Sequence, residues 1–334
     1  MKISASIYSD KKRPLLEVIK DLMEHQVDLL HVDCNDDLSV FDDIKSIRTI
    51  CDIPIDLHVI TTHPSKYYTL LEENPVEYIT FQYEDLEEAL EIPETVTGKK
   101  GIAVITPTDV SIFEGYKDFD FILIMATIPG QSGGKFDTIN FGKIRSFRNQ
   151  YPGKSIHVDG GVNAEVSFIL RNMGVTSAVS GSYLFNASSV GNALMNLTQR
   201  EVESHYHVKD FMIPLNESPI VRESDLSLKT VLLSIEDGNL GFTLVLNETD
   251  KLVGLISNAD VRKGLLRHLD DLNGLSPKEL MNESPITILT EDTALTLLQL
   301  IKKSTFPIMY LPVVDSHGNA KGIVTFVNLI KGEL

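Results

Sequence analysis

The stretch Ser155-Ile156-His157-Val158-Asp159-Gly160-Gly161-Val162 decides how the first 200 residues are interpreted. Its first four residues predict a buried strand, Asp159 stands where that strand ends, and the two glycines allow a sharp turn. In a β/α barrel the C-terminal ends of the strands carry the chemistry, so Asp159 is a candidate catalytic residue. The N–H groups of Gly160 and Gly161 suit an anion such as a sugar phosphate. The alternative is an Asp that only caps the next helix.

Short β-rich runs alternate with amphipathic helical stretches on both sides of this segment, from residue 3 to about residue 197. The predicted strands are 3–8, 29–32, 55–59, 78–81, 101–105, 121–126, 155–158 and 177–179. The predicted helices are 14–25, 40–49, 64–72, 84–90, 109–114, 142–150 and 165–172. Eight strands in such alternation predict an α/β fold, a (β/α)8 TIM barrel over residues 1–200, and not an open sheet.

A charged, histidine-containing segment at residues 201–207 interrupts the pattern and predicts a linker. The chain then repeats itself. Asn216-Glu217-Ser218-Pro219 returns as Asn282-Glu283-Ser284-Pro285, and Gly254-Leu255-Ile256-Ser257 returns as Gly322-Ile323-Val324-Thr325. Two copies, at about 208–270 and 276–334, predict a separate pseudo-twofold module over residues 208–334. His205 and His207 in the linker have a spacing that either binds a metal or belongs to a solvated segment.

Composition sets limits on function. The net charge of −17 argues against nucleic acid and against an anionic membrane surface as partners. No apolar run approaches the roughly 18 residues that a membrane span needs, and the first residues turn polar too soon for a signal peptide. Cys34 and Cys51 are too few for a disulfide framework. These features predict a cytoplasmic protein.

Four residues at predicted strand ends form a candidate metal site. His31 and Asp33 lie on one face of a strand because side chains alternate with period two, and His58 ends the next strand. With Asp159, two imidazoles and two carboxylates meet at one end of the barrel. Such ligands suit zinc, iron, manganese or cobalt. His58 alone could instead be a core histidine that is hydrogen-bonded to backbone.

Two further segments suit a phosphorylated ligand. Residues 124–136 hold three glycines in five residues and predict a loop that closes over the barrel mouth. Gly181 and Ser182 follow another strand, where an N–H group and a hydroxyl can meet a phosphate. The alternative for Ser182 is an ordinary helix cap.

These residues resemble the ribulose-phosphate 3-epimerase family over residues 1–197. The match runs through Ser6-Ile7, His31-Val32-Asp33, Asp56-Leu57-His58, Pro107-Thr108, Met125, Pro129-Gly130, Gly133, Phe136, Asp159-Gly160-Gly161-Val162, Ser180-Gly181-Ser182 and Phe185. The resemblance implies that His31, Asp33, His58 and Asp159 bind a divalent metal, with Asp33 and Asp159 as the catalytic acid and base. It also implies a substrate site of Ser6, Met125, Gly130, Gly133, Gly134, Gly160, Gly161, Gly181 and Ser182.

The chemistry fits these residue types. Inverting a carbon next to a carbonyl needs a base on one face and an acid on the other, through an enediolate that a metal stabilises. The expected substrate is ribulose 5-phosphate, xylulose 5-phosphate or a related ketose phosphate. Departures from the family leave the sugar open: Cys34-Asn35-Asp36-Asp37 replaces the usual sequence after Asp33, and Gln82 replaces a histidine. A barrel that binds a sugar phosphate without turnover, and signals through the C-terminal module, is the alternative.

The repeated module resembles tandem CBS domains. The resemblance implies that Ser257 with Asp260, and Thr325 with Asn328, hold the ribose of an adenine nucleotide, and that Arg262 meets its phosphates. The alternative is a pair that binds nothing and only dimerises. Because both families assemble, we expect a homo-oligomer.

Overall fold

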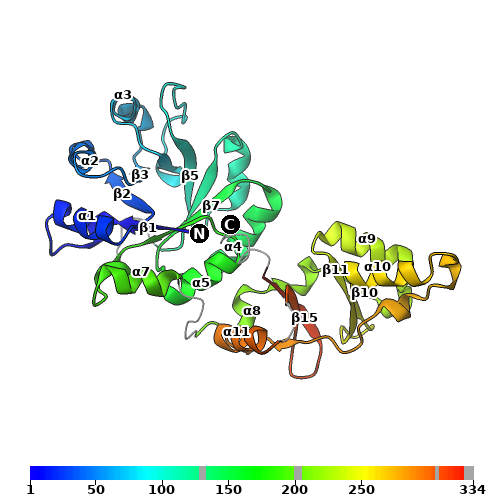
Figure 1. Ribbon diagram of the computed structural model, residues 1–334. Coiled ribbons are helices and arrows are strands. Elements are labelled where there is room, and N and C mark those ends of the chain that lie inside the picture. Colours follow the sequence, from blue (N-terminus) through cyan, green and yellow to red (C-terminus); the bar gives the residue numbers. More distant parts are fainter. Residues whose placement is uncertain (128–132, 199–204, 305–307, 327–334) are drawn as a thin grey trace. The chain divides into compact units, whose positions relative to one another are not determined.

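The computed structural model describes residues 1–127, 133–198, 205–304 and 308–326, and the chain divides into two compact units. The first unit contains the described residues up to Thr198, and the second contains those from His205 to Phe326. Figure 1 colours the chain from the blue N-terminus to the red strand β15.

Parallel strands close into a barrel in the first unit, each paired with its neighbour in chain order and β8 paired with β1. The strands are β1 (Lys2–Ser6), β2 (Leu29–Asn35), β3 (Ile55–Ile60), β4 (Tyr78–Gln82), β5 (Lys99–Ile105), β6 (Phe121–Met125), β7 (Ser155–Asp159) and β8 (Ser177–Ser180). Each predicted strand overlaps one of them, and the predicted (β/α)8 barrel is confirmed.

Helices cover the outside of the barrel (Figure 1). They are α1 (Leu15–Glu24), α2 (Val40–Arg48), α3 (Tyr68–Glu73), α4 (Ile139–Gln150), α5 (Ala164–Asn172), α6 (Ser182–Phe185) and α7 (Val190–Thr198). A 3-10 helix at Val110–Tyr116 stands where a helix was predicted after β5. In α1 the buried residues Val18, Ile19 and Leu22 follow the spacing of an amphipathic helix whose apolar face packs on the barrel.

The predicted helix over residues 84–90 is wrong. The structure has a short 3-10 turn at Tyr83–Asp85, and the described chain then runs without a helix to β5. The Glu84 carboxylate accepts a hydrogen bond from the Ile105 N–H at 3.0 Å, and the Glu87 N–H donates to the Thr62 carbonyl at 3.1 Å. Tertiary hydrogen bonds therefore replace helical ones, and acidic side chains three or four positions apart disfavour a helix here.

The second unit contains two small sheets. One has the order β10 (Ile220–Arg222), β11 (Phe242–Leu246), β12 (Leu252–Ser257), and the other has the order β13 (Ile288–Leu289), β14 (Tyr310–Val314), β15 (Ala320–Thr325), β9 (Ile213–Pro214). The helices are α8 (Val208–Phe211), α9 (Leu228–Gly238), α10 (Asn258–Arg267) and α11 (Ala294–Lys303). The His207 N–H donates to Asp210 at 2.9 Å, so this linker histidine opens α8.

The sequence repeat is a structural repeat. In each copy a parallel strand pair is followed by an antiparallel pair, and the antiparallel pairs shift register at Val245/Leu246 and at Val313/Val314, 68 residues apart. Phe242 and Tyr310, also 68 residues apart, stack with ring centroids 3.8 Å apart. Equivalent side chains from the two copies thus meet in one shared core, as a pseudo-twofold module requires.

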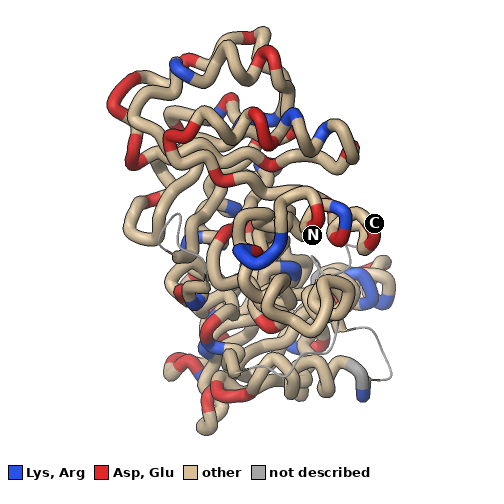
Figure 2. Tube along the Cα trace, turned by 90° about the vertical axis from the view of Figure 1, so that its left-hand side faces the viewer, with Lys and Arg blue, Asp and Glu red and all other residues tan. Residues whose placement is uncertain are grey.

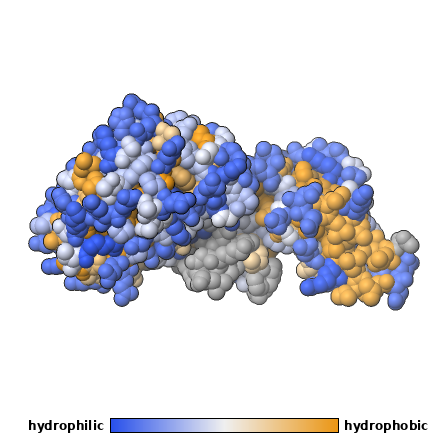
Figure 3. Space-filling view, turned by 90° about the horizontal axis from the view of Figure 1, so that it is seen from above, coloured by the Kyte–Doolittle hydropathy of each residue, from blue (hydrophilic) through white to orange (hydrophobic). Residues whose placement is uncertain are grey.

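Two surface properties bear on function. Asp and Glu outnumber Lys and Arg by 47 to 30, and Figure 2 shows acidic residues along both units. Figure 3 shows a contiguous apolar area on the second unit, where α9, α10 and the turn after α10 expose Leu232, Leu233, Leu266, Leu269 and Leu272. A patch of this kind marks an interaction surface more often than scattered leucines do. Among the described residues no helix is long and apolar enough to cross a membrane.

Candidate active site

The barrel brings together the four residues that the sequence predicts as metal ligands. Strand register pairs Asp33 on β2 with His58 on β3, and β7 supplies Asp159 from across the barrel. Each of the four, His31 included, offers one ligand atom, and these atoms all lie within 4.8 Å of one another. The cluster lies at the C-terminal end of the barrel, the end at which β/α barrels do their chemistry.

The two histidines aim different ring nitrogens at the cluster. His31 Nε2 lies 3.2 Å from Asp33 Oδ1 and 3.8 Å from Asp159 Oδ2, while His58 Nδ1 lies 3.5 Å from Asp33 Oδ1. Both nitrogens are buried, and neither has a well-aligned hydrogen-bond partner among the described residues. Buried polar atoms are normally paired. Two ring nitrogens that lack a well-aligned hydrogen bond and lie beside two carboxylates therefore fit a divalent cation of the zinc, iron, manganese or cobalt type.

Asp56 and Gln82 hold the opposite ring nitrogens of the two histidines, a role that the sequence did not predict for either residue. His31 Nδ1 lies 3.0 Å from Asp56 Oδ2, and the same oxygen accepts a hydrogen bond from Ser4 Oγ at 2.9 Å. His58 Nε2 lies 3.0 Å from Gln82 Oε1. Period-two spacing gives the signal that could have found Asp56, since it lies two residues before His58 on one strand face. Gln82, which replaces a histidine of the family, is buried and lies against His58.

Burial and neighbouring charges shift the pKa values of Asp159 and Asp33 in opposite directions. Burial raises the pKa of Asp159 to about 6, against the opposing effect of the nearby His31. Burial acts in the same sense on Asp33, but His31 and His58 outweigh it and lower the pKa of that carboxyl. A pair of carboxyl groups with divergent proton affinities is suited to separate acid and base roles.

The remainder of the β7 stretch has structural roles. Asn163, not Asp159, caps α5: its side chain accepts a hydrogen bond from the Val166 N–H at 2.9 Å. The helix-cap alternative for Asp159 is therefore wrong. His157 lies deeper, stacked on Phe121 with centroids 4.1 Å apart, and burial lowers its pKa to about 4. It is a neutral core residue.

The glycine turns border this site. Gly161 has φ +67°, and a Cβ added there would lie 2.1 Å from the backbone nitrogen of Phe136. Side chains added at Gly160 and Gly134 would both meet Thr127. The turn after β7 thus packs against the described end of the loop after β6. Of the predicted phosphate-site residues, Gly130 lies outside the described residues.

The C-terminal ends of β1 and β8 complete the rim. Ser6 Oγ lies 3.0 Å from Ser9 Oγ, and a Cβ at Gly181 would lie 2.2 Å from the same Ser9 oxygen. Gly181 precedes α6 without a side-chain cap, so Ser182 is not the N-cap residue of this helix. Met125 is buried and pairs in register with Asp159. Gly133 has φ +91° and no neighbour close to its missing side chain.

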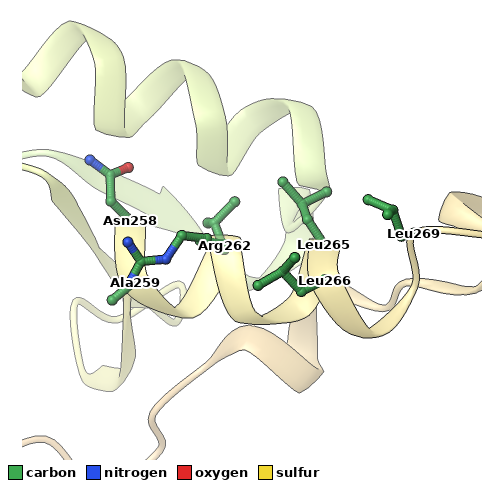
Figure 4. A pocket seen from close by; sticks show the side chains of 7 residues that line it. Asn258, Ala259, Arg262, Leu265, Leu266 and Leu269 are labelled. Atoms are coloured by element: carbon green, nitrogen blue, oxygen red, sulfur yellow. The ribbon is translucent and has the colours of Figure 1, made fainter.

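Of the residues predicted to bind a nucleotide, Ser257 and Asp260 lie at the start of α10. Ser257 ends β12, and its hydroxyl lies 2.6 Å from the Asp260 carboxylate in a reciprocal cap of α10. Thr325 ends β15 at the equivalent position, and Asn328 lies outside the described residues. Arg262 lines a surface hollow of about 570 Å³ with leucines of α10 (Figure 4).

Comparison with known proteins assigns the two units. The model of the ribulose-phosphate 3 epimerase family matches residues 2–185, and that of the CBS domain matches residues 278–333. A ribulose-phosphate 3-epimerase of Methanocaldococcus jannaschii is 31% identical over 227 residues, which cover 64% of this chain and 95% of that protein.

Two further similarities cover smaller parts of the chain. The arabinose 5-phosphate isomerase KdsD of Francisella tularensis is 35% identical over 128 residues, 38% of this chain and 37% of that protein. The crystal structure of the CBS-pair protein CBSX2 from Arabidopsis thaliana is 25% identical, with a TM-score of 0.32, and covers 38% of this chain and 94% of that one. The barrel architecture, the four converging ligand residues and the match over residues 2–185 agree: the chain belongs to the ribulose-phosphate 3-epimerase family of isomerases and carries a C-terminal CBS module.

Proposed function

We propose that the protein is a metal-dependent 3-epimerase of a phosphorylated ketose, with ribulose 5-phosphate and xylulose 5-phosphate as the first candidates. The observation that carries the proposal is the cluster of His31, Asp33, His58 and Asp159. Its ligand atoms lie within 4.8 Å of one another, and two of its ring nitrogens lack a well-aligned hydrogen bond among the described residues. The names of relatives such as the Methanocaldococcus jannaschii enzyme support the choice of substrate class.

Asp33 and Asp159 act as the proton carriers. They project from β2 and β7, strands that are not neighbours in the barrel, so a substrate between them meets one carboxylate on each face. One carboxylate removes the proton from the carbon next to the carbonyl, and the other returns a proton to the opposite face. Their side chains are 22% and 19% exposed, which leaves them reachable from the barrel mouth.

His31, Asp33, His58 and Asp159 would hold a divalent cation, which when bound supplies Lewis-acid stabilisation of negative charge on the substrate oxygens. The histidines are fully buried, whereas both carboxylates are partly exposed. The imidazoles thus anchor the site from within the barrel, and the carboxylates lie between it and the substrate.

Ser6, Met125 and the glycine turns enclose the substrate. Gly160 and Gly161 follow β7, and Gly181 and Ser182 follow the neighbouring β8, where β/α barrels commonly bind phosphate. A Cβ added at Gly134 or at Gly160 would meet Thr127, so both glycines lie close to this residue. This closeness supports a single rim that includes Gly133 and Gly134. These turns hold the phosphate end and orient the sugar carbon between the two carboxylates.

The test is proton exchange. Protein loaded in turn with Zn²⁺, Fe²⁺, Mn²⁺ and Co²⁺ is incubated with D-ribulose 5-phosphate in deuterated water, and we expect deuterium at C3 and xylulose 5-phosphate as product. The Asp33→Asn variant should lose turnover while retaining binding of the sugar phosphate. Absence of exchange with every pentulose and hexulose phosphate tried, despite bound metal, would refute the proposal.

The CBS module is a regulatory site for an adenine nucleotide. Ser257 and Thr325 end equivalent strands of the two copies, and Asp260, Arg262 and Asn328 complete the nominated set. AMP, ADP or ATP should raise the melting temperature, because a ligand selective for the folded state stabilises it. The Asp260→Ala variant is the control. If none of the three nucleotides changes the melting temperature of the wild type or of this variant, the role of the module is assembly.

The protein forms a homo-oligomer through the CBS module. The exposed leucines of α9 and α10 support this, with Leu266 and Leu269 exposing 66% and 69% of their surface. Light scattering should find more than one chain per particle for the wild type and a smaller particle for Leu266→Glu. The exposed Leu38 of the barrel unit gives a matched Leu38→Glu control that should leave the mass unchanged.

A further inference from the structure

Gln82 is the last residue of β4 and is 1% exposed, although it stands at the polar end of the barrel. Its Oε1 lies 3.0 Å from His58 Nε2. Its Nε2 lies 2.5 Å from Glu84 Oε2 and 3.4 Å from the Ala103 carbonyl oxygen. All polar atoms of this amide therefore face a defined partner.

The donors and acceptors fix the direction of the amide. A carboxylate and a carbonyl oxygen only accept hydrogen bonds, so the NH₂ group of Gln82 must face Glu84 and Ala103. The amide oxygen then faces His58 and can only accept, which requires the proton of a neutral His58 ring to be on Nε2. The Nδ1 lone pair is left free, and it points to the ligand cluster, 3.5 Å from Asp33 Oδ1.

Glu84 is itself anchored. Its Oε1 accepts hydrogen bonds from the Ile105 N–H at 3.0 Å and from the Thr108 hydroxyl. A chain of hydrogen bonds thus runs from the end of β5 through Glu84 and Gln82 to His58. Because the far end is held by backbone, the amide has little freedom to turn over and present its NH₂ group to the ring.

We propose that Gln82 is a positioning residue that selects the Nε2–H tautomer of His58 and so presents Nδ1 as a metal ligand. The inference rests on the metal site of the proposed function. Partners that orient a metal-binding histidine commonly change metal affinity about 10–100-fold when they are removed. Gln82 differs from Asp56 in being uncharged. Its influence on His58 therefore comes from the orientation of its amide and not from a charge.

The first measurement uses the metal-free full-length protein and is independent of turnover. Two-bond ¹H–¹⁵N spectra of ¹⁵N-histidine-labelled protein, with the His58 signals identified by their loss in His58→Gln, report which ring nitrogen carries the proton. We expect the Nε2–H form in the wild type and loss of this preference in Gln82→Leu. The Nδ1–H form in the wild type, or an unchanged tautomer in Gln82→Leu, would overturn the inference.

The second measurement is the affinity for Zn²⁺ and Co²⁺ by chelator competition. Gln82→Leu should bind about 10–100-fold more weakly. The double variant Gln82→Glu/Glu84→Gln exchanges acid and amide, so an oxygen still faces His58 and a donor still links the two side chains. It should recover most of the affinity, and failure to do so with a normal melting temperature would count against the positioning role.

Thr80→Val is the matched control. Thr80 lies two residues earlier on the same strand, is fully buried, and its hydroxyl has no hydrogen-bond partner among the described residues. The Thr80→Val variant should leave both the His58 tautomer and the metal affinity unchanged. If it lost as much metal affinity as Gln82→Leu, the effect of Gln82→Leu would be explained by core packing alone. If the wild type binds neither metal, the metal site is wrong, while the tautomer spectra still decide the role of Gln82.

Discussion

Replacing Asp56 by Asn tests how the barrel sets the affinity of its candidate metal site. Asp56 is 1% exposed, and a single oxygen, Oδ2, lies 2.9 Å from Ser4 Oγ and 3.0 Å from His31 Nδ1. An Asn whose carbonyl oxygen takes the place of Oδ2 can accept the same two hydrogen bonds. The substitution therefore removes the charge and conserves the bonding pattern.

The magnitude follows from the kind of bond that is lost. A hydrogen bond to a charged group contributes about 1.5–3 kcal/mol and one between neutral groups about 0.5–1.5 kcal/mol. The Asn variant should thus weaken the hydrogen bond that supports His31 by about 1–1.5 kcal/mol. Metal binding should weaken by about 5–10-fold, near the low end of the range for such partners. Asp56→Ala, which leaves His31 Nδ1 and Ser4 Oγ unpaired, should approach the upper end, about 100-fold.

Chelator competition with Zn²⁺ on the full-length protein measures these affinities. Ser4→Ala is the control, since it removes the other hydrogen bond to Oδ2 and leaves the bond to His31 in place. It should bind Zn²⁺ as the wild type does. Wild-type affinity in Asp56→Asn and Asp56→Ala, or an equal loss in Ser4→Ala, would refute the reasoning that the carboxylate acts through His31.

Three other outcomes are expected. Removing metal with a chelator should lower the melting temperature, and Zn²⁺ at about 100 times its dissociation constant should restore about 2.7 kcal/mol of stability; an unchanged melting temperature would speak against a site in the folded barrel. Gly161→Ala should lower the melting temperature far more than Gly153→Ala, since both glycines have positive φ but only at Gly161 would a Cβ meet backbone, 2.1 Å away; equal effects would contradict the packing argument. Asn163→Ala should destabilise the barrel by about 1 kcal/mol in denaturant unfolding, because it removes the α5 cap. Replacing the exposed Asn192 by Ala should lower the free energy of unfolding by less. The reverse order would contradict the assignment of the cap.

Local patterns in the sequence were sufficient for the strands, the repeat and the candidate ligands. Alternation with period two put His31 and Asp33 on one face, and an acid followed by two glycines marked the end of β7. The repeat predicted two equivalent copies, and the structure shows that both contain an antiparallel strand pair with the same register shift. Such patterns are visible because they depend on neighbours within a few residues along the chain.

Local sequence patterns gave wrong predictions where residues distant in the chain determine the local structure. The segment at residues 84–90 has helical spacing, but Glu84 is bonded to β5 and Glu87 to Thr62. The sequence also left Asp159 open as a helix cap, whereas Asn163 has that role. Side-chain and backbone hydrogen bonds to distant residues outweigh a propensity worth a fraction of a kcal/mol per residue.

The sequence by itself determined the barrel, the repeated C-terminal module and the identity of the four candidate ligands, because strand periodicity, turn residues and repeated segments are visible in the linear sequence. Only the tertiary structure decided that Asp159 on β7 meets His31 and His58, since this requires closure of a barrel across more than a hundred residues of chain. It also decided which ring nitrogens face the site, through Asp56 and Gln82. Hydrogen-bond direction depends on strand register and side-chain rotamers, and a linear pattern contains neither.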